Sequence, residues 1–567
     1  MSGKIPLDPL PQLVGLSDGT LRLLLTVLLA YPVAQVYRAY VLPRWSDKPA
    51  ALNAYNVAVG LALSYFFNGT EIVHSLVTVL LTQLLCTVLA PSNPRAAAAL
   101  VFVWNFGYLL VGYWLTQTEG YDLGWTCPQC ILCLKLIGYG MDVQDGLLAR
   151  RRAPDTQTKA DPKEKKDGPG KDGYAKPLML FDDNTCPLPT VPSLVQLVGF
   201  AYQPVSFIVG PQLSFSYYWS SLQRGLLGAQ DPTALAASGS KGTNGRIRRV
   251  LRSVSLAILY LAGNQLFGAL MPVGAIISPV SDSWSLPYRL GYMIISHRGV
   301  LMRYLGIWSL CEGACVLAGL GYNGLDEKGQ SRWDGLANIY PMQFELSSSL
   351  TSVVGAFNIN TNRWAKRYIF KRLRFLGSKQ LSALGTLAFL AIWHGFHPGY
   401  LLCFGMEFLD MEAERRMVLL WRRMTGGRTL AAPVETAISL LGWLWTNLHL
   451  TYGLAAMEQR VFGRAWLYWQ RVGFFSFWVS IGVILTTVVV SMLFRRPARS
   501  SSLAAKAAKA AGAEPAVELA EAAPVPVSTH DVLVGPQRRR ASVVVEQDDL
   551  EVASHDMAAK IGKLVKD

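Results

Sequence analysis

His394 is the first residue whose chemistry stands out, because it lies inside the strongly apolar stretch AFLAIWHGFHPGYLLCFGMEF. A titratable side chain at membrane depth is expensive and is a candidate functional residue by default. Neutral imidazole is cheap to bury and can act as a general base. A neutral histidine that only bonds neighbouring helices is the alternative. His397 has the same claim in principle, but Pro398 and Gly399 place it at a predicted helix break.

Other reactions that depend on histidine clusters or on activated nucleophiles are disfavoured by the number of histidines and by the sequence motifs of the chain. The chain has seven histidines, and His530 and His555 fall in a charged tail, so a membrane di-iron desaturase with its larger ligand set is excluded. The pair His394 and His397 has no acidic partner motif, and no metal site is expected. The single GxSxG match, Gly15–Gly19 (GLSDG), precedes the first apolar run and follows no predicted strand, so it gives a serine hydrolase no support. No HxxxxD motif or P-loop occurs, which removes HxxxxD glycerolipid acyltransferases and P-loop enzymes.

The cysteines do not add a metal site. Cys127, Cys130 and Cys133 have CxxC spacing, which matches half of a zinc site, but no second CxxC or histidine pair completes it. Most of the eight cysteines lie in apolar segments, as small hydrophobic residues do. We therefore interpret them as structural.

A second polar motif, FNINTNRW, precedes the histidine motif, and its Asn358 lies 36 residues before His394. The motif leads into a basic segment. Asparagine and threonine are good helix N-caps, so Asn360, Thr361 and Asn362 taken alone favour simple capping.

The segment Arg363–Arg374 (RWAKRYIFKRLR) predicts a basic amphipathic helix. At 100° per residue its basic residues share one face, and Trp364, Ile369, Leu373 and Phe375 cover the other. Such a helix lies at the membrane surface, where it anchors to anionic lipid or attracts a phosphate-bearing soluble substrate. Nucleic-acid binding is disfavoured because membrane segments flank the basic face.

The composition indicates what must position these residues. Hydrophobic residues make up 51% of the 567 and charged residues 16%, with 16 Trp, 23 Tyr and a mean hydropathy of +0.27. A soluble protein has about 25% charged residues. The balance favours a polytopic membrane protein over a soluble enzyme, a disordered scaffold or a disulfide-built domain. The candidate spans are Leu21–Leu42, Asn53–Asn68, Val73–Ala90, Ala96–Leu115, Val191–Gly210, Ser253–Ile277, Val300–Gly321, Leu381–Phe408, Val434–Ala456 and Phe474–Phe494.

Breaks and polar stretches complete this organisation. Gly/Pro breaks at Gly210-Pro211, Met271-Pro272 and His397-Pro398-Gly399 suggest a chamber, because irregular backbone at membrane depth survives only where it is buried or lines a cavity. Arg150–Lys176 has nine basic and five acidic residues and predicts a flexible cytoplasmic loop, whereas the tail from Arg495 predicts disorder. The first residues are not expected to act as a signal peptide, and Asn68-Gly69-Thr70 is a sequon whose use depends on a lumenal position.

These motifs together resemble the membrane-bound O-acyltransferases, specifically their lysophospholipid branch, and most closely the type-3 lysophosphatidylcholine acyltransferases. The resemblance rests on FNINTNRWAKRYIFKRLRFLG (357–377) and LAIWHGFHPGYLLCFGMEF (390–408). LKLIGYGMDVQDG (134–146), VGFAYQPVSFIVGPQLS (198–214) and SRWDGLANI (331–339) support it in matching order. A lone WHG is weak, but WHG preceded at this distance by FNINTNRW is specific. The loop 150–176 and the tail match no known pattern of the group.

The resemblance implies a catalytic His394 and Asn358. It implies transfer of an acyl group from acyl-CoA, a co-substrate rather than a bound cofactor, to the sn-2 hydroxyl of a lysophospholipid. Lysophosphatidylcholine is the first acceptor expected, with lysophosphatidylethanolamine or lysophosphatidylserine beside it. Trp393, Glu407 and Trp333 are candidates for lining the chamber. The further substrate-binding candidates are Arg363, Lys366 and Arg367, on the cytoplasmic route of the anionic coenzyme.

The expected fold is an all-α polytopic membrane protein with about ten or eleven transmembrane helices. Broken and re-entrant segments surround an intramembrane catalytic chamber. We expect an N-terminal cytoplasmic or interfacial segment (1–20), a membrane-bound O-acyltransferase domain (21–494) with a flexible basic loop (150–177), and a disordered tail (495–567). The resemblance implies a multi-pass enzyme of the endoplasmic reticulum membrane that acts on phospholipid remodelling. Its expected partners are its substrates and membrane lipid rather than nucleic acid. A homodimer is one of the oligomeric states open to it.

Two alternatives stay open. The first is a membrane O-acyltransferase for another acceptor, such as a sterol, diacylglycerol or a peptide, although FNINTNRW and FIVGPQ favour the lysophospholipid branch. The second is a transporter, which the lack of internal repeats and of mid-span carboxylates disfavours.

Overall fold

The computed structural model describes residues 3–118, 123–152, 178–229, 245–326, 330–426 and 431–493. The named elements of these residues are all helical, and only two isolated β-bridges accompany them, Leu325 with Ser331 and Ile339 with Phe357. The longer helices are α2 (Asp18–Val36), α4 (Pro49–Asn68), α5 (Ile72–Val88), α6 (Pro94–Thr116), α7 (Thr126–Arg152), α10 (Phe215–Ala229), α12 (Gly245–Leu270), α13 (Leu286–Leu317), α17 (Lys379–Trp393), α18 (Pro398–Thr425), α19 (Ala432–Gln459), α20 (Phe462–Arg471) and α21 (Phe475–Leu493).

Short helices and turns connect them. The short α-helices are α1 (Leu10–Val14), α3 (Leu42–Trp45), α9 (Leu194–Ala201), α14 (Pro341–Leu346), α15 (Leu350–Ala356) and α16 (Ile359–Ala365). The 3-10 and π turns are η1 (Tyr37–Val41), η2 (Gly69–Glu71), η4 (Val273–Ile277), η5 (Pro279–Ser281), η6 (Lys366–Phe370) and η7 (Arg372–Leu376).

Six segments of the described chain are long and apolar enough to cross a membrane. They are Asp18–Trp45, Pro49–Val88, Pro94–Thr116, Gly245–Ile277, Leu286–Leu317 and Phe475–Leu493. The segment Pro49–Val88 contains two of the predicted spans, so the six segments correspond to seven of the ten apolar runs. An all-α polytopic membrane fold is therefore confirmed.

Two of the three remaining apolar runs fold differently from simple spans, and the third forms one continuous helix. Val191–Gly210 contains only the eight-residue helix α9, and Pro204 lies in the turns that follow it. Leu381–Phe408 divides into α17 and α18 around the tight turn after His394. Val434–Ala456 belongs to the single 28-residue helix α19. The predicted break before Pro398 is thus confirmed, and it separates two helices.

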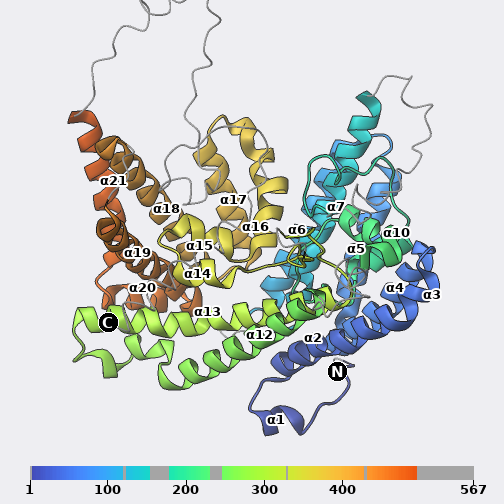
Figure 1. Ribbon diagram of the computed structural model, residues 1–567, viewed down its shortest axis with the longest axis horizontal. Coiled ribbons are helices and arrows are strands. Elements are labelled where there is room, and N and C mark those ends of the chain that lie inside the picture. The colour runs from blue at the N-terminus through green and yellow to red at the C-terminus, as the bar shows by residue number, and fades with distance from the viewer. Residues whose placement is uncertain are drawn as a thin grey trace, which may run out of the picture.

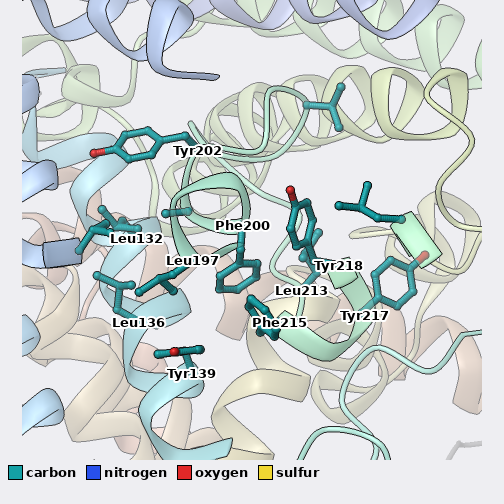
Figure 2. Packing of buried hydrophobic residues seen from close by; sticks show 14 of the residues in the cluster. Leu132, Leu136, Tyr139, Leu197, Phe200, Tyr202, Leu213, Phe215, Tyr217 and Tyr218 are labelled. Atoms are coloured by element: carbon teal, nitrogen blue, oxygen red, sulfur yellow. The ribbon is translucent and has the colours of Figure 1, made fainter. Parts of the chain in front are cut away.

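The largest buried hydrophobic cluster lies where α7, α9 and α10 meet (Figure 2). Leu136 and Tyr139 of α7 pack there with Phe200 of α9 and Phe215 of α10. The rings of Tyr139 and Phe215 meet edge to face with centroids 5.6 Å apart, an arrangement that aromatic pairs prefer. This cluster holds α7 firmly in place, and α7 in turn contacts both halves of the candidate site.

Basic ends of two elements lie at one edge of the molecule (Figure 1). The Arg150–Arg152 end of α7 and the turn η7, which contains Arg372 and Arg374, lie along the upper edge. The positive-inside rule predicts that an edge of this kind faces the cytoplasm. The N-terminal segment lies at the opposite edge, which favours the interfacial option for residues 3–17. The rest of the predicted loop 150–177 and the tail from residue 494 lie outside the described residues.

Candidate active site

His394 lies at a turn that its neighbours in the sequence create. The helix α17 ends at Trp393, and Gly395 then adopts φ of 126°, a backbone conformation that only glycine takes readily. Pro398 starts α18 after the turn. The helix α17 begins near the upper edge, and its 15 residues carry the chain up to about 21 Å away from it. This length is more than half the thickness of a hydrocarbon core, which is about 30 Å.

The protonation pattern of the His394 ring follows from one hydrogen bond. Its Nδ1 lies 2.7 Å from the backbone oxygen of Leu390. A carbonyl oxygen only accepts, so Nδ1 must carry the hydrogen. In the neutral imidazole, Nε2 is then the acceptor, and it makes no hydrogen bond to any described residue. The ring is thus held with its basic nitrogen available.

The walls around His394 are aromatic. Trp393 is buried and donates from Nε1 to the backbone oxygen of Cys130 on α7, at 3.0 Å. The hydroxyl of Tyr113 on α6 donates to the Trp393 backbone oxygen at 3.1 Å, which satisfies a carbonyl at the end of α17. On the other side, the ring centroids of Tyr400 and Phe404 lie 5.7 and 5.2 Å from the His394 ring. His394 itself stays half-buried, so part of its surface faces open space.

Asn358 is held in an unusual backbone conformation directly before α16. Its φ of 48° and ψ of 44° place it in the left-handed region, which asparagine tolerates better than most residues. Although it occupies the N-cap position, its side chain caps no backbone N–H. Asn360 and Asn362 instead hold the surrounding loops through their side-chain amides, to Leu336 and Ala337 and to Val354 and Phe357 respectively. Simple N-capping is thus wrong for this asparagine motif.

The direction of the Asn358 amide follows from its neighbour Asn338. The backbone N–H of Asn360 donates to Oδ1 of Asn338 at 3.0 Å, which fixes Nδ2 of Asn338 as the remaining donor group. That Nδ2 lies 3.3 Å from Oδ1 of Asn358. The two N–H bonds of Asn358 Nδ2 are consequently left without a partner among the described residues. Sequence reasoning missed Asn338, although it lies in SRWDGLANI, one of the stretches that carry the resemblance.

A run of aromatic side chains connects the two halves of the site. Phe357, adjacent to Asn358, meets Trp308 of α13 with ring centroids 4.9 Å apart, and Trp308 meets Tyr304 at 5.9 Å. Tyr304 lies within electrostatic range of Tyr400, the neighbour of His394. These rings are half-buried rather than buried. Ring contacts thus extend from Asn358 along α13 and from His394 along α18, and an electrostatic interaction between Tyr304 and Tyr400 relates the two groups.

The other chamber candidates lie at different distances from this region. Glu407 is half-buried and three residues after Phe404, so it shares the face of α18 that contacts His394, one turn further along. Trp333 is buried, and its ring meets that of Tyr322 in a tilted arrangement with centroids 5.5 Å apart rather than contacting His394. Tyr322 lines a separate cavity between α2, α4 and α10, and that cavity includes none of the predicted site residues.

The basic segment 363–374 is less uniform than the predicted amphipathic helix, since it folds as the end of α16, the π turn η6 and the 3-10 turn η7. Its exposed residues Arg363 and Lys366 make no ion pair within the described residues. Arg367 differs, because its side chain is 7% exposed and pairs with Asp142 of α7 and with Asp183. The predicted role of Arg367 in substrate binding gains no support from this position.

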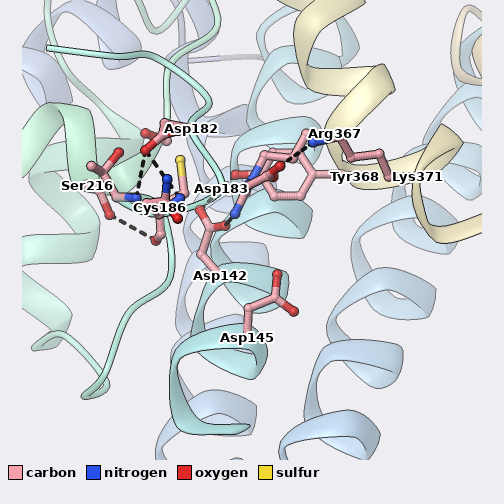
Figure 3. Close-up of polar contacts among 12 residues, drawn as sticks. Asp142, Asp145, Asp182, Asp183, Cys186, Ser216, Arg367, Tyr368 and Lys371 are labelled. Carbon is pink, nitrogen blue, oxygen red and sulfur yellow. Dashed lines mark hydrogen bonds and ion pairs between the residues drawn. The ribbon is translucent and has the colours of Figure 1, made fainter. Parts of the chain in front are cut away.

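Asp142 is the centre of that buried contact (Figure 3). Arg367 lies 3.2 Å from its carboxylate, and the hydroxyl of Tyr368 donates to it at 2.7 Å. Lys371 also pairs with Asp183. The hydrogen bond from Lys371, together with the positive charge of Arg367, lowers the pKa of Asp183 below its ordinary value. These ion pairs fasten the basic segment to α7 and to the loop after Leu178.

The polar contacts of His449, a buried histidine, were not anticipated from the sequence. Nδ1 of His449 on α19 lies 2.8 Å from the Ser476 hydroxyl and 3.1 Å from Asp410, and Ser480 donates to Asp410 at 2.6 Å. In a Ser-His-Asp triad the serine and the carboxylate contact opposite ring nitrogens. Here both face the same nitrogen, so the cluster joins α18, α19 and α21 rather than activating the serine.

Comparisons with a family model and with individual proteins point to the same family. Residues 109–455 match the membrane-bound O-acyltransferase family model. The chain is 35% identical to human lysophospholipid acyltransferase 5 over 413 residues, which is 73% of this chain and 76% of the relative. It is 36% identical to the bovine protein of that name over 79% of this chain and 85% of the relative. The fruit fly protein of that name is 31% identical over 74% and 76%.

Proposed function

The chain belongs to the membrane-bound O-acyltransferase family, and from this premise we propose that it transfers a fatty acyl group from acyl-CoA to the sn-2 hydroxyl of a lysophospholipid. Lysophosphatidylcholine is the first acceptor that we propose. The relatives named lysophospholipid acyltransferase support this branch over others. Such a reaction remodels membrane phospholipids, and the proposed site of action is the endoplasmic reticulum membrane.

The observation that carries the proposal is the hydrogen bond from Nδ1 of His394 to the Leu390 carbonyl. It orients Nε2 as a base without any carboxylate partner. An unactivated alcohol must lose its proton as it attacks a thioester carbonyl, and Nε2 takes that proton. The imidazolium then returns the proton to the departing thiolate of the coenzyme, which leaves as a thiol. Direct transfer of this kind requires no acyl-enzyme intermediate.

Asn358 supplies the complementary group. As the hydroxyl attacks, negative charge develops on the thioester carbonyl oxygen, and preoriented N–H donors stabilise that charge. The bond from Asn338 holds the Asn358 amide with Nδ2 as its free donor end. We therefore assign Asn358 to the developing oxyanion rather than to proton transfer.

The surroundings suit the three reacting molecules. An acyl chain and a lysolipid are both soluble in the membrane, so an aromatic-lined chamber holds them and excludes competing water. The coenzyme moiety is a soluble polyanion and approaches from the cytoplasm, where Arg363 and Lys366 are exposed. Trp393 and Glu407 remain the proposed lining residues beside His394.

The test is acyl transfer by the purified protein in nanodiscs, with radiolabelled acyl-CoA and a panel of lysophospholipids. We expect His394→Ala to lose turnover by about 10²–10⁴-fold and Asn358→Ala by about 10²–10³-fold, as for a general base and an oxyanion donor. Both variants should elute like the wild type in size-exclusion chromatography. Retained turnover in His394→Ala would contradict the mechanism, and near-normal rates in Asn358→Ala would contradict the second assignment. Light scattering on the same samples tests the proposed homodimer.

Another acceptor is the alternative within the family. A sterol, diacylglycerol or a peptide offers the same hydroxyl chemistry to His394 but carries no zwitterionic phosphodiester. The panel therefore includes these acceptors at equal mole fraction. Transfer to one of them, with none to any lysophospholipid, would replace the proposed substrate while keeping the mechanism.

A further inference from the structure

A charged cluster lies next to the candidate base and has no role in the mechanism above. Arg303 is near the midpoint of α13, one of the six candidate spans. It pairs with Glu458 of α19 at 3.1 Å and donates to the Tyr304 hydroxyl at 3.0 Å. Charged residues within a membrane span are expensive and mark substrate sites or pathways. The side chains of Arg303 and Glu458 are 33% and 17% exposed, so both reach accessible space.

Arg460 brings a second positive charge to the same place. It follows the last residue of α19 with φ of 57°, which side-chain-bearing residues rarely adopt. Its guanidinium makes no hydrogen bond or ion pair within the described chain, and Nη1 is buried. A buried donor of a charged group is costly to leave unsatisfied, so an anionic group that accepted a hydrogen bond from it would be stabilised.

The cluster is held close to His394 by the interlocked ends of α18 and α19. The N–H of Gly399 donates to the Arg460 backbone oxygen at 2.8 Å, and a Cβ on Gly399 would lie 2.2 Å from the Ala456 oxygen. The next residue, Tyr400, packs against His394 and is within electrostatic range of Arg303, Glu458 and Arg460. One tyrosine therefore separates the charged cluster from the candidate base.

We propose that Arg303, Arg460 and Glu458 bind the zwitterionic phosphodiester head group of the lysophospholipid. This inference rests on the proposed function and specifies how its acceptor is recognised. The two guanidinium groups contact the phosphate, and the Glu458 carboxylate contacts the ammonium group. In a lysophospholipid, four covalent bonds separate the sn-2 oxygen from phosphorus, roughly 5 Å at about 1.5 Å per bond. A head group bound beside Tyr400 thus presents its sn-2 hydroxyl to His394.

The kinetic test compares Arg460→Gln with wild type in nanodiscs, with lysophosphatidylcholine as acceptor. We expect KM for this acceptor to rise about tenfold or more, the loss of one charge-assisted hydrogen bond, while KM for acyl-CoA and kcat stay unchanged. Arg460→Lys should recover most of the affinity. Glu458→Gln should weaken use of lysophosphatidylcholine but not of lysophosphatidylglycerol, which has no ammonium group. The control is Arg416→Gln, which breaks a partly buried pair with Glu412 on α18, away from the cluster, and should change neither KM.

A binding measurement separates this inference from the proposed function. The probe is 2-deoxy-lysophosphatidylcholine, which has the head group but no acceptor hydroxyl, and its binding is followed by intrinsic tryptophan fluorescence. Binding by wild type that is lost in Arg460→Gln supports the site, even if the wild type transfers acyl groups only to another acceptor. Equal binding by both, or an equal rise in KM for acyl-CoA and acceptor, overturns it. Acyl transfer to lysophosphatidylcholine with unchanged Arg460→Gln kinetics would leave the proposed function standing and refute the head-group site.

Discussion

The side-chain amide of Asn338 donates to Oδ1 of Asn358 at 3.3 Å, and its own Oδ1 accepts from the backbone N–H of Asn360. The bond from the backbone N–H of Asn360 fixes the orientation of the Asn338 amide, and Asn338 in turn fixes the orientation of the Asn358 amide. We call this pair of hydrogen bonds the asparagine relay. Asn338 does not need to touch a substrate to matter, because it determines which end of the Asn358 amide is free. It is therefore a positioning residue for the proposed oxyanion donor.

Replacing Asn338 by aspartate tests this relay with almost no change in shape. The Asn338→Asp carboxylate still accepts from Asn360, but it can only accept from Asn358, so the Asn358 amide must turn its Nδ2 inward. We expect kcat to fall by about 10²–10³-fold, as for Asn358→Ala, with KM for both substrates little changed. The double variant Asn338→Asp/Asn358→Ala should be no worse than either single variant. Additive losses in that cycle would show that Asn338 acts independently.

The two exposed cations of the basic segment carry a second prediction. Arg363→Gln and Lys366→Gln should raise KM for acyl-CoA by up to about fivefold each, since an exposed ion pair is worth about 0.2–1 kcal/mol. The effect should shrink at high salt, where screening reduces the attraction. Arg464→Gln on α20, an exposed cation at the opposite edge, is the control. Salt-independent losses, or equal losses in the control, would argue against attraction of the coenzyme.

The sequence predicts the membrane class well, because composition and hydropathy report burial directly. It also predicts the break at Pro398, because the effect of proline on the backbone is local. It does not predict that Arg367 is buried against Asp142, because the two residues are 225 positions apart and no local pattern connects them. The amphipathic pattern around Arg367 assumed a uniform helix, which the π turn η6 interrupts. Asn338 and Asp410 are not predicted either, because no local sequence pattern connects them with their polar partners.

The buried pair of Asp142 and Arg367 predicts a large effect on stability. Asp142→Asn leaves a buried guanidinium with only the exposed Asp183 as its counter-charge, which costs about 3–5 kcal/mol when a buried pair is broken. Asp145→Asn, one turn along α7, breaks a half-exposed pair with Arg372 and should cost at most about 1 kcal/mol. Thermal aggregation followed by fluorescence-detected size-exclusion chromatography measures both. Similar midpoints for the two variants would contradict the buried role of Asp142.

The sequon at Asn68 gives the last prediction. Its side chain is 3% exposed, and Nδ2, the atom that would carry a glycan, donates to the Ser64 hydroxyl at 3.2 Å inside the helix end. A glycan at this atom requires the surrounding helix to open, because no room exists for it in the folded chain. We expect the protein expressed in animal cells to show no mobility change after treatment with an N-glycosidase, and Thr70→Ala to migrate like the wild type. A deglycosylation shift that disappears in Thr70→Ala would mean that Asn68 is modified before α4 packs, and that the packing around it differs from the arrangement described.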